Sequence, residues 1–389
     1  SSEKDFEIIL DTIQLDVAAQ IAKDVIAPRA AEVDRTAEYP EDYFQAFRDS
    51  ELLGITLPEM VGGSDAGTLA LAIAVEEVAK YDCSAGLMLL LSSLSTHTIK
   101  FFGTERQQKE YIGPIATGQI KGAFCLTEPD AGSDVANLQA RAVRDGDDYV
   151  ISGQKIYISG GPVADQVVVF AKTDYPDPRS LNAFVVDTSM PGFEVTSIDR
   201  KMGVRGLPTG VLTFDDVRVP RERLVGETEG MGMKGPLATL NSLRPVVGAR
   251  GVGLGEGALM YALDYARQRR AFGNPLTDLQ AIQMKLADMA IDIEAARLLV
   301  YQGCELVDAG KFGPSDGHML SVAKAYATEM ANRVASEAIQ ILGGQGYMED
   351  HPLERHYRDA RQLMIVEGTS EIQRVIISKA LIDGNLNYN

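Results

Sequence analysis

One carboxylate near the C-terminus stands where it could act as a base. Glu367 directly follows the apolar run Leu363-Met-Ile-Val366. A carboxylate at the edge of a hydrophobic segment loses hydration, which raises its pKa and suits a general base at neutral pH. The same residue could equally be an exposed acid in the first turn of a helix, where the helix dipole favours negative charge.

A second candidate segment is the polar loop Thr127-Glu-Pro-Asp-Ala-Gly-Ser133-Asp134, which follows an apolar run. It gathers side-chain and backbone donors among turn-forming residues, as expected of a loop that cradles a phosphate or an isoalloxazine ring. The alternative is an ordinary surface turn.

Several other kinds of site are disfavoured. The four histidines occupy unrelated contexts without an H-E-x-x-H pattern, and the glycine clusters match neither a G-x-G-x-x-G directly after a strand nor a phosphate-binding P-loop. We expect the glycines from Gly251 to Gly257 to serve close helix packing. Gly343 and Gly344 follow an apolar helical pattern and could be a helix C-cap or part of a binding site.

The elements that must position these residues follow a helical, β, helical order. Apolar residues recur at helical spacing from Phe6 to Ile21, and short β-branched runs fill the region between about residues 121 and 232. Long helical periodicity then returns. We predict a mainly α protein with a central β domain: an N-terminal helical domain at 1–120, a β-barrel-like domain at 121–232 and a C-terminal helical bundle at 233–389.

Local signals fix several turns and helix ends. Capping boxes are predicted at Thr104–Gln107 and at Thr277–Gln280, each starting a helix. Asp145-Gly146 predicts a hairpin turn, since glycine accepts a positive φ. Pro245 lies inside a helical pattern and predicts a kink or a break there.

Composition limits the partners and the compartment. The 389 residues carry a net charge of −18, which repels nucleic acid and anionic lipid, and no apolar run is long enough to cross a membrane. Three cysteines without C-x-x-C spacing indicate neither a disulfide framework nor a metal cage. These features, with an N-terminus unlike a signal or transit peptide, favour the bacterial cytoplasm, although a mature protein of the mitochondrial matrix would look the same.

Five separated motifs together resemble the acyl-CoA dehydrogenase family. They are Phe124-Cys-Leu-Thr-Glu-Pro-Asp-Ala-Gly-Ser-Asp134, Ser152-Gly-Gln-Lys-Ile-Tyr-Ile-Ser159, Arg269-Arg-Ala-Phe-Gly273, Ala338-Ile-Gln-Ile-Leu-Gly-Gly-Gln-Gly346 and Ile365-Val-Glu-Gly-Thr-Ser-Glu-Ile-Gln-Arg374. They occur in the family's order over essentially the whole chain. The resemblance implies two helical domains around a β domain, a homotetramer, and FAD bound between domains and across a subunit interface.

The resemblance also implies the reaction, α,β-desaturation of an acyl-CoA thioester. Glu367 matches the family's catalytic carboxylate, which removes the α-proton while the β-hydride passes to flavin N5. The thioester oxygen would be bound by the backbone N–H of Glu367 and by a flavin hydroxyl. One branch instead carries its glutamate before the arginine matched here by Arg244, but this chain has Leu243 there.

Several matched positions are implied to hold FAD. Beside the isoalloxazine ring the resemblance implies Phe124, Leu126, Thr127, Ser133, Tyr157 and Ser159, the last two in place of a W-I-T segment of many members. Thr369 and Glu371 match further flavin contacts. The adenosine pyrophosphate of a neighbouring subunit's FAD would be held by Arg269, Phe272, Gln280, Gln340, Gly343 and Gly344.

The substrate side is matched by Ser133, Asn241, Arg244 and Gly368, with Met88-Leu-Leu-Leu91 either lining the acyl cavity or filling the core. Val366 stands where many straight-chain members have tyrosine, leaving room for a branched or cyclic acyl group. The glutaryl branch has a carboxylate-binding arginine where Ala85 aligns here. A dicarboxylic acyl group is therefore disfavoured, although an arginine elsewhere could compensate.

The resemblance thus predicts an FAD-dependent acyl-CoA dehydrogenase for a short or medium acyl group, which passes its electrons to electron-transferring flavoprotein. Two alternatives stay open at this point. One is an oxygen-using relative such as an acyl-CoA oxidase, and the other is a flavin-free helical interaction protein.

Overall fold

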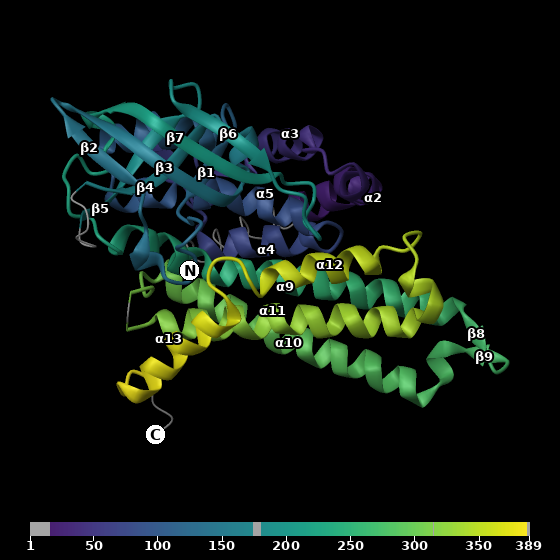
Figure 1. Ribbon diagram of the computed structural model, residues 1–389. Coiled ribbons are helices and arrows are strands. Elements are labelled where there is room, and N and C mark those ends of the chain that lie inside the picture. The colour runs from purple at the N-terminus through teal and green to yellow at the C-terminus, as the bar shows by residue number, and fades with distance from the viewer. Residues whose placement is uncertain (1–15, 174–179, 314, 387–389) are drawn as a thin grey trace.

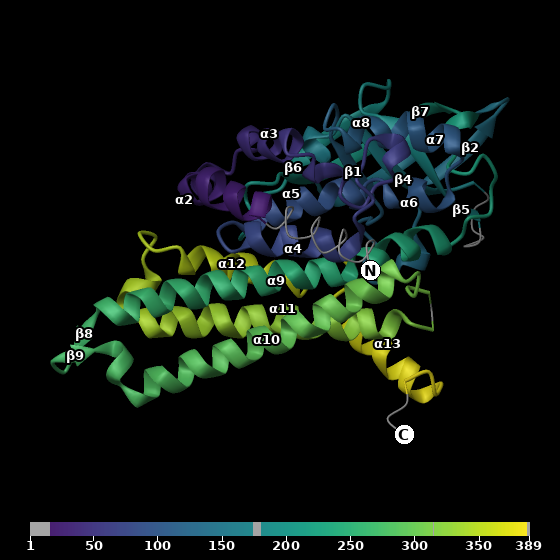
Figure 2. The ribbon, with the colours of Figure 1, turned by 180° about the vertical axis from the view of Figure 1, so that it is seen from behind.

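The computed structural model describes residues 16–173, 180–313 and 315–386. A C-terminal helical bundle forms one side of the molecule, and the N-terminal helices with a curled sheet form the other (Figures 1 and 2). The predicted architecture of helices, a central sheet and a helical bundle is therefore confirmed. Among the described residues, no helix is long and apolar enough to cross a membrane.

The helices before the sheet surround one fully buried helix. They are α2 Ala27–Thr36, α3 Glu41–Asp49, α4 Gly67–Ala79, α5 Cys83–Leu94, α6 His97–Phe102, α7 Glu105–Gln107 and α8 Gly113–Ala116, with π-helical turns at Ala22–Ile26 and Gln108–Ile112. Every residue of α5 is buried, because α4, α9 and β1 enclose it. Asp82 caps α5 by accepting a hydrogen bond of 2.7 Å from the backbone N–H of Ser84.

Two N-terminal predictions can be compared with these helices. The capping box is confirmed, since the hydroxyl of Thr104 accepts from the N–H of Gln107 and the Gln107 side chain accepts from the N–H of Thr104. In the predicted first helix, Val17 and Ile21 lie in the helical residues 16–21. The part from Phe6 to Ile13 lies outside the described residues.

The central sheet has seven strands in the order β1-β4-β2-β3-β7-β6, with β5 paired to β4. The strands are β1 Gly122–Cys125, β2 Arg141–Asp145, β3 Asp148–Ser159, β4 Gln166–Lys172, β5 Leu181–Asp187, β6 Phe193–Ile198 and β7 Thr209–Pro220. The predicted hairpin is confirmed: β2 and β3 pair antiparallel, and Gly146 in their turn has a φ of +66°. The short β-branched runs predicted between about residues 121 and 232 lie in strands of this sheet.

The bundle consists of long helices joined at one end by a short hairpin. These elements are α9 Lys234–Gln268, β8 Arg270–Ala271, β9 Asn274–Pro275, α10 Gln280–Asp308, α11 Gly317–Leu342, α12 Leu353–Leu363 and α13 Ser370–Ile382. The β8–β9 hairpin lies at the end of the bundle farthest from α13, as both views show (Figures 1 and 2). The predicted domain limits after residues 120 and 232 stay a prediction, although β1 begins at Gly122 and α9 at Lys234.

Helix α9 packs closely against its neighbours through its glycines, as predicted. A Cβ atom at Gly253 would lie 2.1 Å from the carbonyl oxygen of Glu76 in α4, and one at Gly257 would lie 2.0 Å from that of Lys80. A Cβ atom at Gly251 would lie 2.8 Å from the carbonyl oxygen of Ala327 in α11. These glycines therefore let three backbones approach within contact distance.

One local prediction in the bundle is wrong, and part of a second is. Thr277 caps no helix, because it lies in a 3-10 turn at Leu276–Asp278 and α10 begins at Gln280 without a side-chain cap. Of the kink or break predicted at Pro245, the break is absent, since α9 runs unbroken from Lys234 to Gln268, and the kink stays a prediction. The ring of Pro245 lies 3.0 Å from the Cβ position of Gly303 in α10, so it fills space that this glycine leaves.

The glycine contacts lead to a stability prediction. Gly253→Ala should lower the free energy of unfolding by about 1–3 kcal/mol, because the added methyl group meets a backbone carbonyl that cannot move aside. Thermal unfolding at a fixed scan rate measures the effect. Gly255→Ala is the matched control, since its methyl group would meet only the flexible Met330 side chain at 3.1 Å. Equal midpoints for the two variants would contradict the packing argument.

Candidate active site

Glu367 lies in the short connection between α12 and α13, which several bonds hold in place. Both Glu367 and Gly368 have positive φ values, +52° and +93°. The carbonyl of Gly368 accepts hydrogen bonds of 2.8 Å from Lys324 Nζ and from Gln373 Nε2. Thr369 then caps α13 by accepting from the N–H of Ile372. The backbone around the carboxylate is thus fixed on both sides.

The carboxylate of Glu367 has the environment of a base. Its Oε2 atom is buried and has no hydrogen-bond partner among the described residues. Burial raises its pKa to about 7, and the positive charges of three neighbouring side chains oppose that shift. The group therefore changes its charge near neutral pH. Glu371, not Glu367, is the exposed acid in the first turn of the helix.

The three neighbouring cations are Arg244, Arg250 and Lys324. All are buried, and none of them forms an ion pair within the described part of the chain. Arg244 donates to the hydroxyl of Ser321, and burial lowers its pKa to about 10. Burial likewise lowers the pKa of Lys324 to about 8. A region this rich in unpaired positive charge favours an anion.

Sequence reasoning named Arg244 but missed Arg250 and Lys324. Arg250 is fully buried in the middle of α9, and Lys324 is fully buried in α11. The available signal was a lone cation within an apolar helical run, such as Ser321-Val-Ala-Lys324. The spacing within each helix gave no motif to match.

The residues predicted beside an isoalloxazine ring lie on two strands and on the loop after the first of them. Phe124 lies in β1, Leu126, Thr127 and Ser133 lie on the following loop, and Tyr157 and Ser159 lie on β3. The carbonyl of Thr127 accepts a hydrogen bond of 2.9 Å from the N–H of Ile156, which joins the loop to β3. The alternative of an ordinary surface turn therefore fits only part of this loop, because a hydrogen bond ties the loop to the sheet.

A buried ion pair holds the base of this loop. Lys155 Nζ donates to Glu128 Oε1 at 2.7 Å, and both side chains are buried. Glu128 also accepts from the backbone N–H groups of Gln139 and Ala140. Two residues further along β3, an irregularity in its pairing with β7 gives Tyr157 a φ of +57° and leaves its side chain exposed. The bulge turns this ring out of the sheet.

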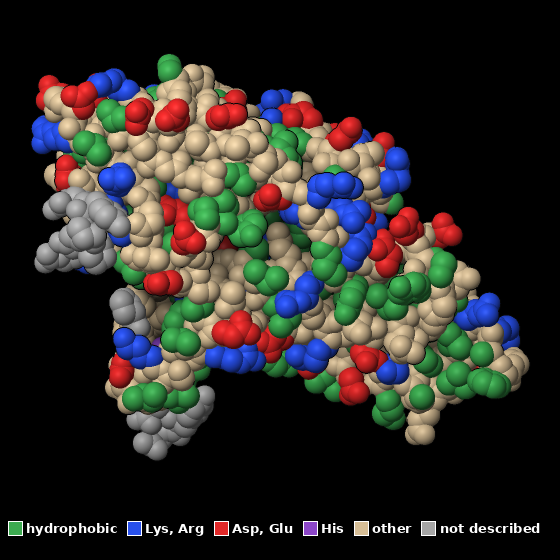
Figure 3. All heavy atoms as spheres, viewed as in Figure 1, with side chains coloured by type: hydrophobic (Ala, Val, Ile, Leu, Met, Phe, Trp, Pro, Cys, Tyr) green, Lys and Arg blue, Asp and Glu red, His purple; other side chains and the backbone are tan. Residues whose placement is uncertain are grey.

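A chain of polar contacts leads from Ser159 on β3 to Lys201. The hydroxyl of Thr209 lies 3.5 Å from that of Ser159 and accepts a hydrogen bond of 3.0 Å from Lys201 Nζ. Burial lowers the pKa of Lys201 to about 8; the charge of Asp359 opposes that shift and the charge of Arg250 contributes to it. Arg250 thus acts electrostatically on both Lys201 and Glu367. Figure 3 shows the molecule hollowed where the sheet meets the bundle.

The second predicted group lies at the far end of the bundle. Its members are all exposed: Arg269, Phe272, Gln280, Gln340, Gly343 and Gly344. Phe272 is 92% exposed and Gly343 caps α11 with a φ of +60°, as the C-cap prediction stated. The hydrogen bond of 2.7 Å between Tyr261 and His351 joins the segment after α11 to the end of α9.

Distance separates this group from Glu367 within one chain. Arg244 lies inside α9 and Arg269 is its C-cap residue, and the 25 residues between them correspond to about 37 Å of helix. A single FAD beside Glu367 could meet the tip group only if another copy of the chain supplied it. The exposed rings of Tyr157 and Phe272, with Arg269 for phosphate, fit the ring system and the pyrophosphate of FAD under that condition.

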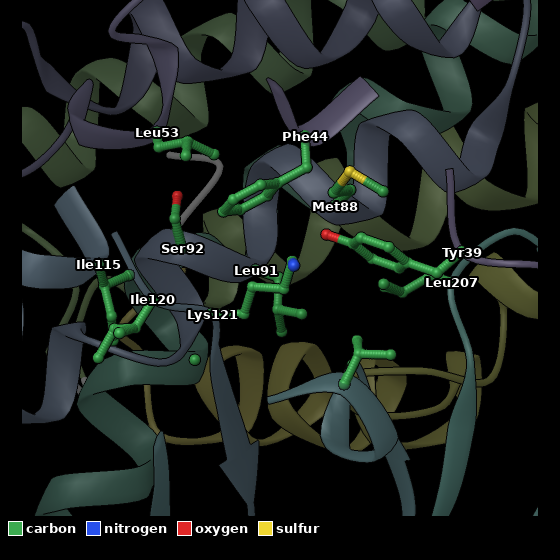
Figure 4. A pocket seen from close by; sticks show the side chains of 13 residues that line it. Tyr39, Phe44, Leu53, Met88, Leu91, Ser92, Ile115, Ile120, Lys121 and Leu207 are labelled. Atoms are coloured by element: carbon green, nitrogen blue, oxygen red, sulfur yellow. The ribbon is translucent and has the colours of Figure 1, made fainter. Parts of the chain in front are cut away.

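The remaining predicted substrate residues lie on α9 and α5. Asn241 donates to the carbonyl of Phe312 at 3.0 Å, one turn before Arg244. The residues Met88 to Leu91 are all buried in the main core. Met88 and Leu91 line a small cavity with Tyr39, Phe44 and Lys121 (Figure 4), and no residue predicted to contact FAD or the CoA thioester lines it.

Comparisons with known proteins identify the family. Three family models match the chain in order: the acyl-CoA dehydrogenase N-terminal domain at 12–119, the middle domain at 123–217 and the C-terminal domain at 230–382. The probable acyl-CoA dehydrogenase YngJ of Bacillus subtilis is 41% identical over 370 residues, covering 94% of this chain and 96% of that protein.

Two solved structures share the fold. Butyryl-CoA dehydrogenase from Megasphaera elsdenii superposes with a TM-score of 0.92 at 38% identity, covering 96% of this chain and 98% of that one. A glutaryl-CoA dehydrogenase from Mycobacterium smegmatis in complex with FADH2 gives 0.90 at 29% identity, covering 97% and 96%. The chain thus belongs to the acyl-CoA dehydrogenase family, whose members are FAD-dependent oxidoreductases that act on acyl-CoA thioesters.

Proposed function

We propose that this protein desaturates an acyl-CoA between C2 and C3, with Glu367 removing the α-proton. The observation that carries the proposal is the unpartnered, buried Oε2 of Glu367, with its pKa near neutrality. A carboxylate that titrates near pH 7 is matched to proton abstraction at that pH. FAD, when bound, supplies the acceptor for the β-hydrogen and its two electrons.

The chain's own residues would prepare this proton transfer. Lys324 and Gln373 fix the carbonyl of Gly368, and so hold the peptide that follows the base. Among the described residues, the backbone N–H of Glu367 makes no hydrogen bond, which leaves it available to the thioester oxygen. A fixed donor at the developing enolate stabilises it without reorganisation. Acyl-CoA entering the cleft would expel water and make Glu367 a stronger base.

We further propose that FAD is bound between two copies of the chain in a homotetramer. One copy would hold the isoalloxazine ring with Phe124, Leu126, Thr127, Ser133, Tyr157, Ser159, Thr369 and Glu371, and another would hold the adenosine pyrophosphate with its tip group. Exposed apolar side chains at a seven-residue spacing on α10 support association: Met284, Ile291 and Leu298. Such a stripe on a soluble helix is typical of a helix-packing surface.

The acyl group and the electron acceptor are further parts of the proposal. Ser133, Asn241, Arg244 and Gly368 would contact the CoA thioester, and Val366 leaves room for a branched or cyclic acyl group of short or medium length. Electrons would leave through electron-transferring flavoprotein.

Anaerobic mixing with acyl-CoA tests the reaction. Butyryl-, octanoyl-, isobutyryl- and cyclohexanecarboxyl-CoA should differ in the rate at which they bleach the flavin absorbance, and at least one should bleach it. Glu367→Gln should keep the flavin but lose about 10³-fold or more in bleaching rate and in α-proton exchange. Glu305→Gln is the matched control, since Glu305 is an exposed glutamate on α10 that belongs to no predicted site.

Stopped-flow reoxidation separates a dehydrogenase from an oxidase. The substrate-reduced protein should be reoxidised quickly by electron-transferring flavoprotein and slowly by air. Fast reoxidation by air would support the oxidase instead, and retained α-proton exchange in Glu367→Gln would assign the base to another residue.

The pKa of Glu367 predicts a pH profile. Because the base acts only when ionised, kcat/KM should rise about tenfold per pH unit below about pH 7 and level off above it. Lys324→Met removes a charge that lowers this pKa, so the rising limb should move to higher pH. Lys285→Met, which removes a surface ion pair with Glu337, is the control and should leave the limb unchanged. A limb that stays in place in Lys324→Met would contradict the electrostatic argument.

The tip group gives a separate prediction about the cofactor. Arg269→Gln should weaken FAD binding about tenfold or more, because a charge-assisted hydrogen bond to phosphate is lost. Arg267→Gln is the matched control, since Arg267 is also exposed and pairs with Asp264 one turn earlier. FAD retention after gel filtration at several dilutions measures the difference. Equal retention in both variants would argue against the tip group as the binding site.

A further inference from the structure

Arg250 is a buried cation whose donors are only partly used. It is 0% exposed, and it lies six residues after Arg244 in α9. Its Nη2 atom donates to Gln362 Oε1 at 3.0 Å and contacts the carbonyl oxygen and sulfur of Cys83 at 3.3 and 3.4 Å. Its Nε and Nη1 atoms are buried and have no partner among the described residues. All of the contacts it makes are to uncharged groups.

Burying a guanidinium without an anion is costly, so its surroundings should contain a negative charge. The nearby carboxyl groups do not supply it. Asp82 and Asp359 accept backbone hydrogen bonds from Ser84 and Val204, and the cation that acts on both is Arg355. Glu367 does feel the charge of Arg250, but no ion pair joins them.

The region therefore lacks compensation for its cations. Glu367 feels the charges of Arg250, Lys324 and Arg244, and none of these three forms an ion pair in the described chain, although Glu329 also acts on Lys324. Even with Glu367 ionised, positive charge exceeds negative charge here. One further anion would restore the balance.

The position of the guanidinium relates it to the acyl group. The side chain of Arg250 passes beside Gly86, where a Cβ atom would lie 3.3 Å from Arg250 Cγ, and its head reaches Cys83 at the start of α5. Ala85 lies between Cys83 and Gly86 in the sequence. By the resemblance described above, it stands where the glutaryl branch has its carboxylate-binding arginine. Small residues on α5 thus leave the space that an arginine from the facing helix fills.

We propose that Arg250 binds a carboxylate at the far end of the acyl group, so that the preferred substrate is a short dicarboxylic acyl-CoA. The inference rests on the proposed function, because it uses Glu367 as the group beside the reacting carbons. In the reaction the α-proton passes to Glu367, the β-hydrogen leaves with its electron pair to FAD, and a C2–C3 double bond forms. The distal carboxylate stays attached and remains bound by Arg250 Nε and Nη1.

Matched pairs of thioesters test the inference. Glutaryl-CoA is compared with pentanoyl-CoA, and adipoyl-CoA with hexanoyl-CoA, by kcat/KM and by the rate of flavin bleaching in the holoenzyme. At least one dicarboxylic member should exceed its monocarboxylic counterpart by about 10²-fold. Arg250→Gln should bring the ratio of dicarboxylic to monocarboxylic kcat/KM close to one. The ratio is measured on the alkaline plateau, because the variant also removes a charge that lowers the pKa of Glu367. Arg267→Gln, on the exposed face of the same helix, should keep the advantage.

The outcomes separate this inference from the proposed function. If none of the thioesters bleaches the flavin, the proposed function itself fails. If pentanoyl- or hexanoyl-CoA bleaches it and neither dicarboxylic thioester does so faster, only the role of Arg250 is overturned. An equal loss on both classes in Arg250→Gln would also overturn it, and would make Arg250 a positioning residue for Glu367. If Arg250→Gln does not fold, Arg250→Lys and the wild-type protein are compared on the same pairs of thioesters, and that comparison decides the role of Arg250.

Discussion

A single carboxylate, Glu367, faces three buried cations. The free energy that it costs to bury these charges shapes the structure around them. Burial pushes the carboxyl group toward its neutral form, whereas Arg244, Arg250 and Lys324 pull it toward its charged form. The result is a carboxyl group that can change its charge near neutral pH. Lys324 also binds the carbonyl of the next residue, so one side chain both lowers the pKa of Glu367 and fixes the backbone beside it.

Helix α9 brings most of this machinery together. Its glycines let the backbones of α4 and α11 approach closely, and its first half carries Asn241, Arg244 and Arg250. The helix then ends beside Arg269 at the tip of the bundle. One continuous helix thus connects the region around Glu367 with the exposed tip of the bundle.

Much of the fold could be predicted because its signals are local. The hairpin at Asp145-Gly146 and the cap at Thr104 depend on neighbouring residues alone, and both are confirmed. The cap predicted at Thr277 and the break predicted at Pro245 are wrong because tertiary context decided them. Thr277 lies in a tight turn, and the ring of Pro245 packs against Gly303 within an unbroken helix. The spacing of apolar residues around Glu367 could not show whether its carboxylate is buried, since burial depends on contacts with helices distant in sequence. Arg250 and Lys324 were missed for the same reason, and the tip group could be named only through a family resemblance.

The close packing of α9 also limits how its sequence could change. Inserting one residue near Gly253 would turn everything beyond it by about 100° and shift it by about 1.5 Å. Gly257 would then no longer face Lys80, and Arg269 would point in a new direction. Side chains in this helix can be exchanged one at a time, but its length cannot, because a single added residue would disturb the core and the tip together.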